Sequence, residues 1–558
     1  MGSIESIFPM NIKTFSNLNR QENSHEIRNN TYDLIVIGGG ITGAGILLDA
    51  ASRGLKTLLI EKGDYSSGTS SKSTKLIHGG LRYLKQFDFW LVKEVGTERA
   101  IVHKLAPHLV QPEKMLLPLV EKGSYGKWLT SIGLKIYDIL ADVEGEDQRQ
   151  MLDKKQALEK EPLLPKKILK GAGYYAEYRT DDARLTLEVI KTALRYDAVA
   201  INYTEVLEFI YKDNLVKGVK VFDHLLKEEY KIDATHIINA TGPWVDDIRH
   251  LNKSLQGDTL QLTKGVHLVF PHEKLPVTQS IYFDVPDGRM IFAIPRAKVT
   301  YVGTTDTLYN KNKEEVRTEV VDAIYLIEAV NHMFPKVNLT LEDVVSSWAG
   351  LRPLIQQEGK SPSELSRKDE IFISPSDLIS IAGGKLTGYR KMAERAVDKV
   401  IDRIEKHKGD LLKNCYTDTI TISGGPWENY NEVLQYIQKV FKNIEPLGFT
   451  QHDAWFLVTT YGKQVEKILK IYDSINEKDI YKRLIQAEFQ FCTEYEMIAT
   501  PSDFFIRRTG RLFFDIQNLK DHLDTILQAY KYHFKVRDSQ VEKEKSKLLN
   551  AIKNSELH

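Results

Sequence analysis

A glycine-rich turn between two short apolar strands is the feature that most constrains how this chain can fold. Residues 34–37 (Leu-Ile-Val-Ile) are apolar and mostly β-branched, which is typical of a buried parallel strand. Residues 38–43 then have the spacing G-x-G-x-x-G, and residues 44–52 are expected to form a helix. A second apolar strand over residues 56–60 ends at Glu61. This order predicts the βαβ unit of a dinucleotide-binding fold.

The residues of this turn have separate physical roles in such a unit. Gly38 permits the tight turn, Gly40 allows a pyrophosphate to approach the backbone, and Gly43 allows the helix to pack close to the strand. The start of the helix presents backbone N–H groups and the positive end of its dipole to the phosphates. Glu61, eighteen positions after Gly43, is placed to accept hydrogen bonds from a ribose hydroxyl.

The composition of the 558-residue chain argues against several other classes of protein. Lys+Arg and Asp+Glu are both 76, so the net charge is zero and a general nucleic-acid binder is not expected. Two cysteines, Cys415 and Cys492, are too few for a disulfide framework or a cysteine-based zinc site, and no other cluster suggests a metal site. The first 30 residues lack the apolar run of a secretory signal, and no apolar stretch approaches the ~18 residues of a spanning helix. A reducing, cytoplasmic location fits best.

A loop rich in hydroxyl groups follows the second strand and distinguishes between the dinucleotides. Residues 68–71 (Gly-Thr-Ser-Ser) provide hydroxyls and backbone N–H groups that suit ribityl and phosphate oxygens. Residues 76–83 (Leu-Ile-His-Gly-Gly-Leu-Arg-Tyr) then mix buried and reactive side chains, which is unlike a solvated polar loop. The pair of segments favours FAD over NAD.

The segment 68–84 resembles the signature of the FAD-dependent glycerol-3-phosphate dehydrogenases, within the D-amino-acid-oxidase-like flavoprotein superfamily. Further motifs of that family follow in the family's order, so that the resemblance covers about residues 30–400. They are YRTDDARL at 178–185, NATGPW at 239–244, KGVH at 264–267, DGR at 287–289, GTTD at 303–306, GLRPL at 350–354 and GGKLT at 383–387.

The resemblance implies an α/β fold in which a Rossmann-like FAD-binding domain carries an antiparallel-sheet substrate domain and a helical C-terminal domain. Apolar and charged residues recur at helical spacing beyond about residue 410, as in 454–461 and 465–472. The expected boundaries are 1–30 for a flexible N-terminal extension, 31–110, 186–254 and 345–405 for the discontinuous FAD-binding domain, 111–185 and 255–344 for the substrate-binding domain, and 410–558 for the C-terminal domain.

The fingerprint and the resemblance together predict which residues bind FAD. They are Gly38, Gly40, Ile41, Thr42, Gly43, Glu61, Gly68, Thr69, Ser70, Ser71, Val206, Gly242, Gly384, Leu386 and Thr387.

The implied substrate is glycerol 3-phosphate, a phosphate ester with a secondary alcohol at C2. Its oxidation needs cations for the phosphate, a base for the hydroxyl proton, and the C2 hydrogen facing the flavin. Arg352 and Arg82 are favoured as the phosphate ligands, because a planar guanidinium pairs with phosphate through two parallel hydrogen bonds. Tyr83, Arg367 and Lys385 are expected to contribute further substrate contacts.

Three residues are candidates for the base. His78 is favoured because it lies inside the most specific motif, its imidazole titrates near neutrality, and two glycines beside it leave room for a ligand. His267 is the competitor, and Lys264 would serve only with a depressed pKa. Lys264 and Lys385 are alternatively suited to stabilise negative charge on the reduced flavin.

The electron acceptor is left open by these motifs. The leading expectation is a quinone. The alternative is an oxidase that reduces O2 to H2O2, although oxidases of the family usually carry an insertion for which this chain is too short. A non-catalytic flavin-binding redox sensor is a third hypothesis, but it need not keep His78, Arg82, Arg352 and Lys385 together.

A quinone acceptor implies peripheral contact with the inner face of the cell membrane. Residues 127–140 have one apolar helical face flanked by lysines, which is suited to a membrane interface, although the same face would also suit a domain core. Basic residues of the C-terminal domain, Arg507, Arg508 and Arg511, are an alternative contact. A homodimer is compatible with the sequence.

Overall fold

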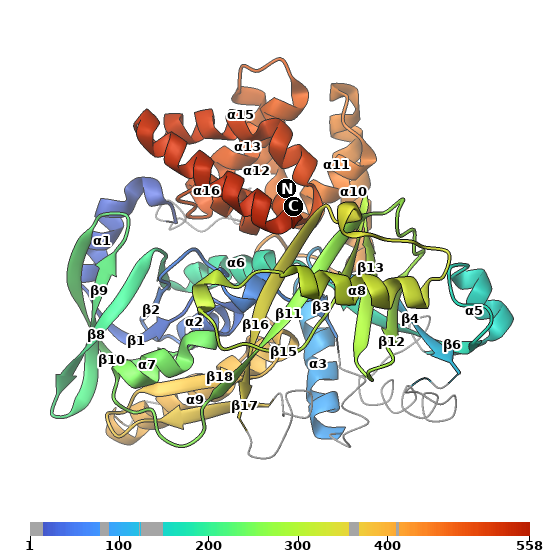
Figure 1. Cartoon of the computed structure of the whole chain (residues 1–558). Helices are drawn as coiled ribbons and strands as arrows, with labels where there is room; N and C mark the ends of the chain where they lie inside the picture. The colour runs from blue at the N-terminus through green and yellow to red at the C-terminus, as the bar shows by residue number, and fades with distance from the viewer. Residues whose placement is uncertain are drawn as a thin grey trace.

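The computed structural model describes residues 15–78, 89–121, 123, 149–356, 368–408 and 412–557. Within them, two β-sheets lie side by side and a group of C-terminal helices, drawn in orange to red, gathers over both (Figure 1). The predicted combination of an α/β nucleotide-binding part, a second sheet and a helical C-terminal part is therefore confirmed. No helix in the described segments is both long and apolar enough to cross a membrane.

The first sheet is built around the predicted βαβ unit, and its strand order is β17-β18-β10-β1-β2-β7 with the hairpin β8–β9 attached to β10. Its strands are β1 (Thr31–Ile37), β2 (Thr57–Ile60), β7 (Val199–Ile201), β8 (Thr204–Lys212), β9 (Leu215–Asp223), β10 (Glu228–Asn239), β17 (Asp369–Ile373) and β18 (Ile379–Gly383). The five strands from β18 to β7 run parallel, so their carboxyl ends meet at one edge. Ligands of such sheets bind at this edge.

The alternation of side chains along β1 explains why both faces of the first sheet are covered. Leu34 and Val36 join one apolar cluster, and Ile35 and Ile37 join another on the opposite face. The helices α2 (Ile41–Ser52), α6 (Asp182–Ala193) and α9 (Tyr389–Lys408) contribute to the first cluster, with α2 contacting both others. A strand with two buried faces reads as a continuous apolar run, which is the pattern of residues 34–37.

The second sheet is antiparallel except for the parallel pair β4–β12, and its strand order is β15-β11-β14-β13-β12-β4-β6-β3. β16 pairs with β11, and β5 pairs with β6. The strands are β3 (Leu76–Ile77), β4 (Gln111–Val120), β5 (Gln150–Asp153), β6 (Leu169–Arg179), β11 (Leu260–Pro271), β12 (Ser280–Asp284), β13 (Met290–Arg296), β14 (Val299–Gly303), β15 (Thr307–Leu308) and β16 (Ser346–Ile355). The helices that accompany the two sheets are α3 (Phe89–Leu105), α5 (Lys154–Lys160), α7 (Val245–Leu251) and α8 (Val320–Met333).

Two segments expected in the FAD-binding domain belong to the second sheet. β16 pairs with β11 along its whole length, from Ser346 opposite Val269 to Ile355 opposite Leu260, and β3 pairs with the end of β6. The expected boundary at residue 345 therefore lies one strand too early. An apolar strand buried on both faces does not reveal from its own residues which sheet it joins.

The N-terminal segment differs from the expected flexible extension. Phe15 is 2% exposed, and the helix α1 (Arg20–Arg28) is anchored at its first residue. The Arg20 guanidinium donates to Asp223 Oδ2 (2.8 Å) and to Thr204 Oγ1 (2.8 Å), and both partners are buried. Residues 15–30 are consequently part of the folded body, and a contact with residues some 200 positions away leaves no local signal in the sequence.

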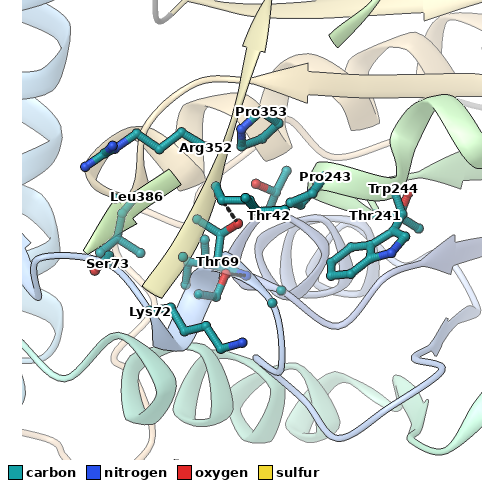
Figure 2. Close-up of a pocket in the computed structure, with 18 of the residues that line it drawn as sticks. Thr42, Thr69, Lys72, Ser73, Thr241, Pro243, Trp244, Arg352, Pro353 and Leu386 are labelled. Carbon is teal, nitrogen blue, oxygen red and sulfur yellow. Dashed lines mark hydrogen bonds between the residues drawn. The ribbon is translucent and has the colours of Figure 1, made fainter. Parts of the chain in front are cut away.

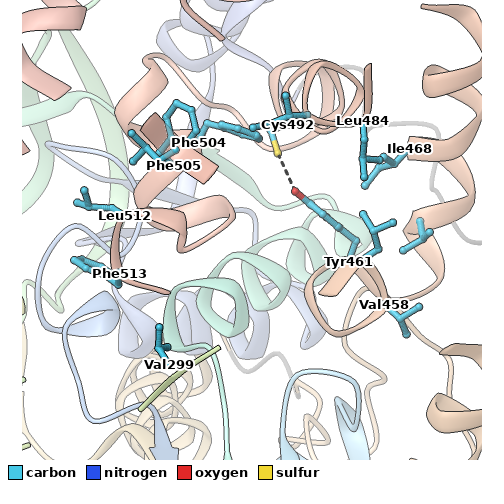
Figure 3. Close-up of a cluster of buried hydrophobic side chains, with 14 of the residues drawn as sticks. Val299, Val458, Tyr461, Ile468, Leu484, Cys492, Phe504, Phe505, Leu512 and Phe513 are labelled. Carbon is cyan, nitrogen blue, oxygen red and sulfur yellow. Dashed lines mark hydrogen bonds between the residues drawn. The ribbon is translucent and has the colours of Figure 1, made fainter. Parts of the chain in front are cut away.

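The C-terminal part is helical, as predicted, and shares its apolar core with the second sheet. Figure 3 shows part of that cluster, in which Val299 of β14 joins residues of the C-terminal helices such as Phe504 and Tyr461. The helices are α10 (Tyr430–Ile444), α11 (Gln451–Tyr461), α12 (Val465–Ser474), α13 (Ile480–Tyr495), α14 (Arg511–Phe514), α15 (Ile516–Phe534) and α16 (Asp538–Glu556). A shared core holds the two parts in one arrangement.

Buried ion pairs also join the C-terminal helices to Asp64, in the loop that follows β2. Arg508 is 1% exposed and donates two hydrogen bonds to Asp64, at 2.7 and 2.8 Å, and Arg507 donates a third at 2.5 Å. Arg511 is also buried and pairs with Glu488 (2.6 Å). These three arginines are therefore not the basic membrane-facing patch that was considered as an alternative contact. Residues 127–140, the other segment considered, lie outside the described residues.

Candidate active site

A cavity of about 1180 Å³ lies between the two sheets at the carboxyl edge of the first. Figure 2 shows part of its lining, which comes from the β1–α2 turn, the loop before β3, the turn after β10, β16 and the turn after β18. Its volume exceeds the roughly 300–1,000 Å³ of ordinary small-molecule sites. The cavity therefore has room for a dinucleotide together with a small second ligand.

The β1–α2 turn forms a cradle suited to phosphates at one end of this cavity. Gly40 is the N-cap of α2 and provides no side-chain cap, and the Ile41 N–H donates to Ser70 Oγ at 2.9 Å. A Cβ atom on Gly43 would lie 1.9 Å from the Gly38 carbonyl oxygen, so only glycine allows α2 this close to the turn. Gly40, Ile41 and Thr42 at the start of the helix line the cavity, which is the end of a helix that binds phosphate.

Glu61 directly follows β2 at the same edge and lines the cavity. Its Oε2 accepts the Gly39 N–H at 2.6 Å and its Oε1 accepts the Gly63 N–H at 2.8 Å. Burial raises the pKa of this carboxyl, while the two backbone hydrogen bonds act to lower it. The carboxylate is thereby fixed beside the cradle, where a ribose hydroxyl would be within its reach.

The loop before β3 is tied to the second sheet across the cavity. Thr69 Oγ1 donates to the Leu351 carbonyl of β16 at 2.7 Å (Figure 2). Lys72, in the same loop, lines the cavity, and burial together with the charge of Arg507 lowers its pKa to about 8. Lys72 has no assigned role in the sequence-based site, although the motif at 68–84 contains it.

Most of the predicted FAD-binding residues line this one cavity. They are Gly38, Gly40, Ile41, Thr42, Glu61, Gly68, Thr69, Ser70, Val206, Gly242, Gly384, Leu386 and Thr387. The other two lie just behind it: Gly43 permits the close packing of α2, and the Ser71 carbonyl accepts from Lys75 Nζ at 3.1 Å.

Arg352 belongs to β16 and lines the side of the cavity opposite the cradle. Its Nη1 donates to the Thr305 carbonyl at 2.9 Å and lies 3.3 Å from Asp306 Oδ1, and its Nη2 donates to Thr304 Oγ1 at 2.7 Å. A Cβ on Gly265 would lie 2.4 Å from this guanidinium, so the glycine of the KGVH motif makes its space. The GTTD motif, which carried no assigned role, therefore fixes the orientation of the arginine.

The two candidate histidines both line the cavity but differ in surroundings. His267 is 1% exposed, its ring stacks on Trp348 (4.8 Å between ring centroids), and its Nε2 lies 3.0 Å from Thr74 Oγ1. Burial, followed by the charges of Arg352 and Lys75, holds its pKa well below the usual value. His78 is half-buried, with its ring 6.0 Å from that of Phe292. His78 is thus the more accessible acceptor of a proton.

The structure corrects the expectation for Lys264. Along β11, Gly265 and His267 line the cavity and Lys264 does not, because successive side chains point to opposite faces of a sheet. Lys264 Nζ donates to Asp322 at 2.6 Å and to Glu319 at 2.9 Å, and these partners keep its pKa above the usual value although burial lowers it. The depressed pKa that a lysine base would need is absent.

Of the remaining predicted substrate residues, one lines the cavity and three lie outside the described residues. Lys385 lines the cavity in the turn after β18 and is half-buried. Arg82, Tyr83 and Arg367 lie outside the described residues.

Comparisons with known proteins agree with this architecture. A family model described as FAD dependent oxidoreductase matches residues 33–378, and one described as the C-terminal domain of alpha-glycerophosphate oxidase matches residues 415–541. The aerobic glycerol-3-phosphate dehydrogenase of Bacillus subtilis (strain 168) is 49% identical over 541 residues, which cover 96% of this chain and 97% of that protein. The one of Staphylococcus aureus (strain bovine RF122 / ET3-1) is 47% identical, covering 97% and 98%.

The solved structures include a similar protein with its cofactor. The glycerol-3-phosphate dehydrogenase from Bacillus halodurans complexed with FAD has a TM-score of 0.84 and 42% identity, covering 97% of this chain and 99% of that one. An L-alpha-glycerophosphate oxidase from Mycoplasma pneumoniae shares the fold at a TM-score of 0.56 and 20% identity.

The chain belongs to the FAD-dependent oxidoreductases of the D-amino-acid-oxidase type. Within that class, similarity over nearly its whole length places it in the family of aerobic glycerol-3-phosphate dehydrogenases. The prediction of FAD as the cofactor is confirmed. The open cradle at α2 and the volume of the cavity fit that dinucleotide.

Proposed function

We propose that this chain oxidises sn-glycerol 3-phosphate to dihydroxyacetone phosphate and passes the electrons to a quinone. The observation that carries the proposal is that Arg352, His78 and Lys385 line the same cavity as the dinucleotide cradle. These residues would provide a phosphate ligand, a proton acceptor and a second cation around one space that also has room for the cofactor.

Arg352 is the proposed phosphate ligand. Thr304 and the Thr305 carbonyl hold its guanidinium in one orientation, so little rotamer freedom is lost when a phosphate binds. Gly265 keeps backbone rather than side chain beneath it. Lys385, on the far turn, is proposed to add a second positive charge toward the substrate or the reduced flavin.

His78 is the proposed base. It removes the C2 hydroxyl proton of the substrate, and FAD, when bound, accepts the hydride from the same carbon. His267 is disfavoured because its burial and the neighbouring cations Arg352 and Lys75 oppose the protonated imidazolium. We propose that His267 instead shapes the cavity wall through its stacking on Trp348.

The proposal is tested by anaerobic mixing of the purified FAD-loaded protein with glycerol 3-phosphate. Flavin bleaching is expected, and His78→Asn should slow it by about 10²–10⁴-fold while leaving substrate binding nearly unchanged. His267→Asn is the matched comparison and should slow bleaching much less. Bleaching at the normal rate in His78→Asn would assign the base elsewhere, and no bleaching of the unmodified protein would refute the substrate.

The electron acceptor is decided by the second half of the same experiment. After bleaching, a quinone analogue or oxygen is added, and the quinone is expected to restore the oxidised flavin much faster. Fast reoxidation by oxygen with stoichiometric H2O2 would support the oxidase alternative instead. Names of the similar proteins support the dehydrogenase, since they are aerobic glycerol-3-phosphate dehydrogenases.

A quinone dissolved in the bilayer requires the protein to reach the membrane surface, so we propose peripheral association with its inner face. Co-sedimentation with liposomes, with and without anionic lipid, tests this association. Binding should be accompanied by faster quinone reduction. A protein that stays in the supernatant and is not activated by lipid would refute it.

A further inference from the structure

A second cavity lies away from the flavin site, between the second sheet and the C-terminal helices. Its volume is about 510 Å³. It is bounded by the end of β6, the turn between β13 and β14, and the helices α11, α13 and α15. The cavity falls within the size range of small-molecule sites, and nothing in the proposed reaction uses it.

Cations from the second sheet line one side of this cavity. Arg179 ends β6, Arg296 ends β13, and the exposed Lys298 follows in the turn before β14. Arg179 Nη1 donates to the Pro295 carbonyl at 2.9 Å, which fixes its guanidinium beside that of Arg296. Burial lowers the pKa of Arg296 and the charge of Arg179 lowers it further, while the charge of Asp181 raises it, and the pKa stays below its usual value. Asp181 therefore compensates the positive charge of Arg296 only in part.

Arg296 carries the clearest sign of a missing partner. Its Nη2 lies 3.4 Å from Asp181 Oδ2, a long contact, and its Nη1 is buried with no hydrogen-bond partner. A buried donor without a partner costs roughly 1–3 kcal/mol. His522 Nδ1, on α15, is another buried side-chain atom without a partner at the same cavity. A bound anion would accept from Arg296 Nη1, and from His522 Nδ1 in the tautomer that carries its proton on that nitrogen.

The carboxylates around the cavity other than Asp181 already accept hydrogen bonds from neighbouring groups of the chain. Asp453 accepts from Thr450 N (2.7 Å), Asp479 from Tyr481 N (3.0 Å) and Asp515 from Asn518 N (3.3 Å). Glu488 is paired with Arg511 at 2.6 Å, and Asp521 accepts from Gln517 at 2.7 Å. These carboxylates thus already accept from backbone N–H groups at helix starts, from Gln517 or from Arg511, whereas Arg296 Nη1 keeps a donor without a partner.

We propose that this cavity is a second anion site, which binds a small compound carrying a phosphate group. A tetrahedral dianion matches cations that approach from separate elements, and guanidinium groups pair with phosphate through two parallel hydrogen bonds. Trp455 and Phe456 of α11 add an aromatic wall, with Trp455 5.9 Å from the Arg179 guanidinium carbon. The compound binds there without reacting.

The position of the cavity makes such a ligand a regulator. Arg296 stacks on Phe514 (3.9 Å), Phe514 contacts Trp348 (5.6 Å between centroids), and Trp348 stacks on His267 (4.8 Å) of the flavin cavity. One layer of aromatic rings therefore separates the two cavities. An anion that draws Arg296 away from Phe514 changes the packing behind His267.

The test is a titration of the FAD-loaded protein with inorganic phosphate at ionic strength held constant with sodium chloride. Two signals distinguish the two sites. The Trp455 signal is the part of the fluorescence change that is missing in Trp455→Phe, and it reports binding in the second cavity. The flavin absorbance reports binding in the first. A saturable Trp455 signal is expected in the unmodified protein. Its half-saturation should rise at least tenfold in Arg296→Met and also rise in Lys298→Met, which changes only an exposed side chain.

Two matched variants complete the test. Arg317→Met removes an exposed arginine outside the cavity and should change neither signal. Arg352→Lys should weaken the flavin response and leave the Trp455 response intact, so failure of the proposed catalytic site is distinguishable from failure of this one. A Trp455 signal that is absent in the unmodified protein would overturn the proposal, and so would a half-saturation that is the same in Arg296→Met and Lys298→Met as in the unmodified protein.

Discussion

Two carboxylates three positions apart, Glu61 and Asp64, are held by opposite kinds of contact. Glu61 accepts two backbone N–H groups from its own βαβ unit, and burial raises its pKa. Asp64 is also buried but accepts hydrogen bonds from Arg507 and Arg508, whose charges lower its pKa to about 2. The first contact is local and belongs to a motif. The second joins residues more than 440 positions apart and fastens the C-terminal helices to the loop after β2.

The contacts of Glu61 and those of Asp64 have two different functions. The glycine cradle and Glu61 form a surface for a ligand, so damage there should remove FAD. The Asp64 pairs have no access to the cavity, since Asp64 is 2% exposed and does not line it. Damage there should lower the stability of the whole protein. The following experiments test that division, beginning with the largest expected effect.

Gly43→Ala should abolish FAD binding. The added Cβ would lie 1.9 Å from the Gly38 carbonyl oxygen, so α2 must move away from the turn and its N–H groups leave the phosphate position. Absorbance of the purified protein near the flavin bands measures the outcome. Gly54→Ala, at the end of the same unit, is the control: its Cβ meets nothing within 4 Å, and its positive φ adds only local strain. A yellow Gly43→Ala protein would show that the cradle tolerates displacement.

Asp64→Asn should lower the free energy of unfolding by about 3–5 kcal/mol. The substitution leaves Arg508, which is 1% exposed, without the charge that compensates it. Chemical denaturation followed by circular dichroism measures the loss. Glu228→Gln breaks the surface pair with Arg28, whose partners are 33% and 52% exposed, and should cost no more than about 1 kcal/mol. Equal losses in the two variants would contradict a structural role for the buried network.

The sequence predicted the local units of the fold better than it predicted the contacts that join distant segments. The cradle follows from residues 34–61 because glycine spacing, strand run and acid are all within one local unit. The assignments of β16 to the second sheet and of residues 15–30 to the folded body did not follow, because each depends on pairing with a distant segment. Arg508 has the same limitation: nothing next to it in the sequence distinguishes a buried ion pair from a membrane-facing charge.

The substrate side of the site was predicted in part for a similar reason. Arg352 and His78 stand in motifs, and both line the cavity. Lys264 stands in a motif as well, but the alternation along β11 turns it toward α8. A motif indicates that positions matter together, while the face each side chain occupies depends on the strand's register.

Arg352→Lys should weaken substrate binding by about 1.5–3 kcal/mol, which corresponds to roughly a 10–150-fold rise in the substrate concentration for half-maximal flavin reduction. Lysine keeps the charge but loses the planar fork that Thr304 and Thr305 orient. Stability and FAD content should remain unchanged, in contrast to Asp64→Asn and Gly43→Ala. Rapid mixing at a series of glycerol 3-phosphate concentrations provides the measurement, and an unaltered dependence would exclude Arg352 as the phosphate ligand.

The last prediction uses pH to separate Asp64 from Glu61. A carboxyl whose pKa is lowered on folding stabilises the protein above its unfolded pKa and loses that contribution as the pH falls through the folded value. Asp64 therefore loses its contribution to stability between about pH 4 and about pH 2, and the loss is about 2.5 kcal/mol at roughly 1.4 kcal/mol per pKa unit.

The pKa of Glu61 shifts on folding in the opposite direction, because it is raised in the FAD-free protein. Its contribution to stability decreases as the pH rises above the unfolded pKa of a glutamate. Unfolding free energies of FAD-free protein are compared across pH for the unmodified chain, Asp64→Asn and Glu61→Gln. The difference in unfolding free energy between the unmodified chain and Asp64→Asn should be constant above about pH 4 and decrease below it. The stability of the unmodified chain relative to Glu61→Gln should instead decrease as the pH rises above about 4. Parallel curves for the two variants would mean that the two carboxylates are held alike, because a shared response to pH requires pKa shifts of the same sign.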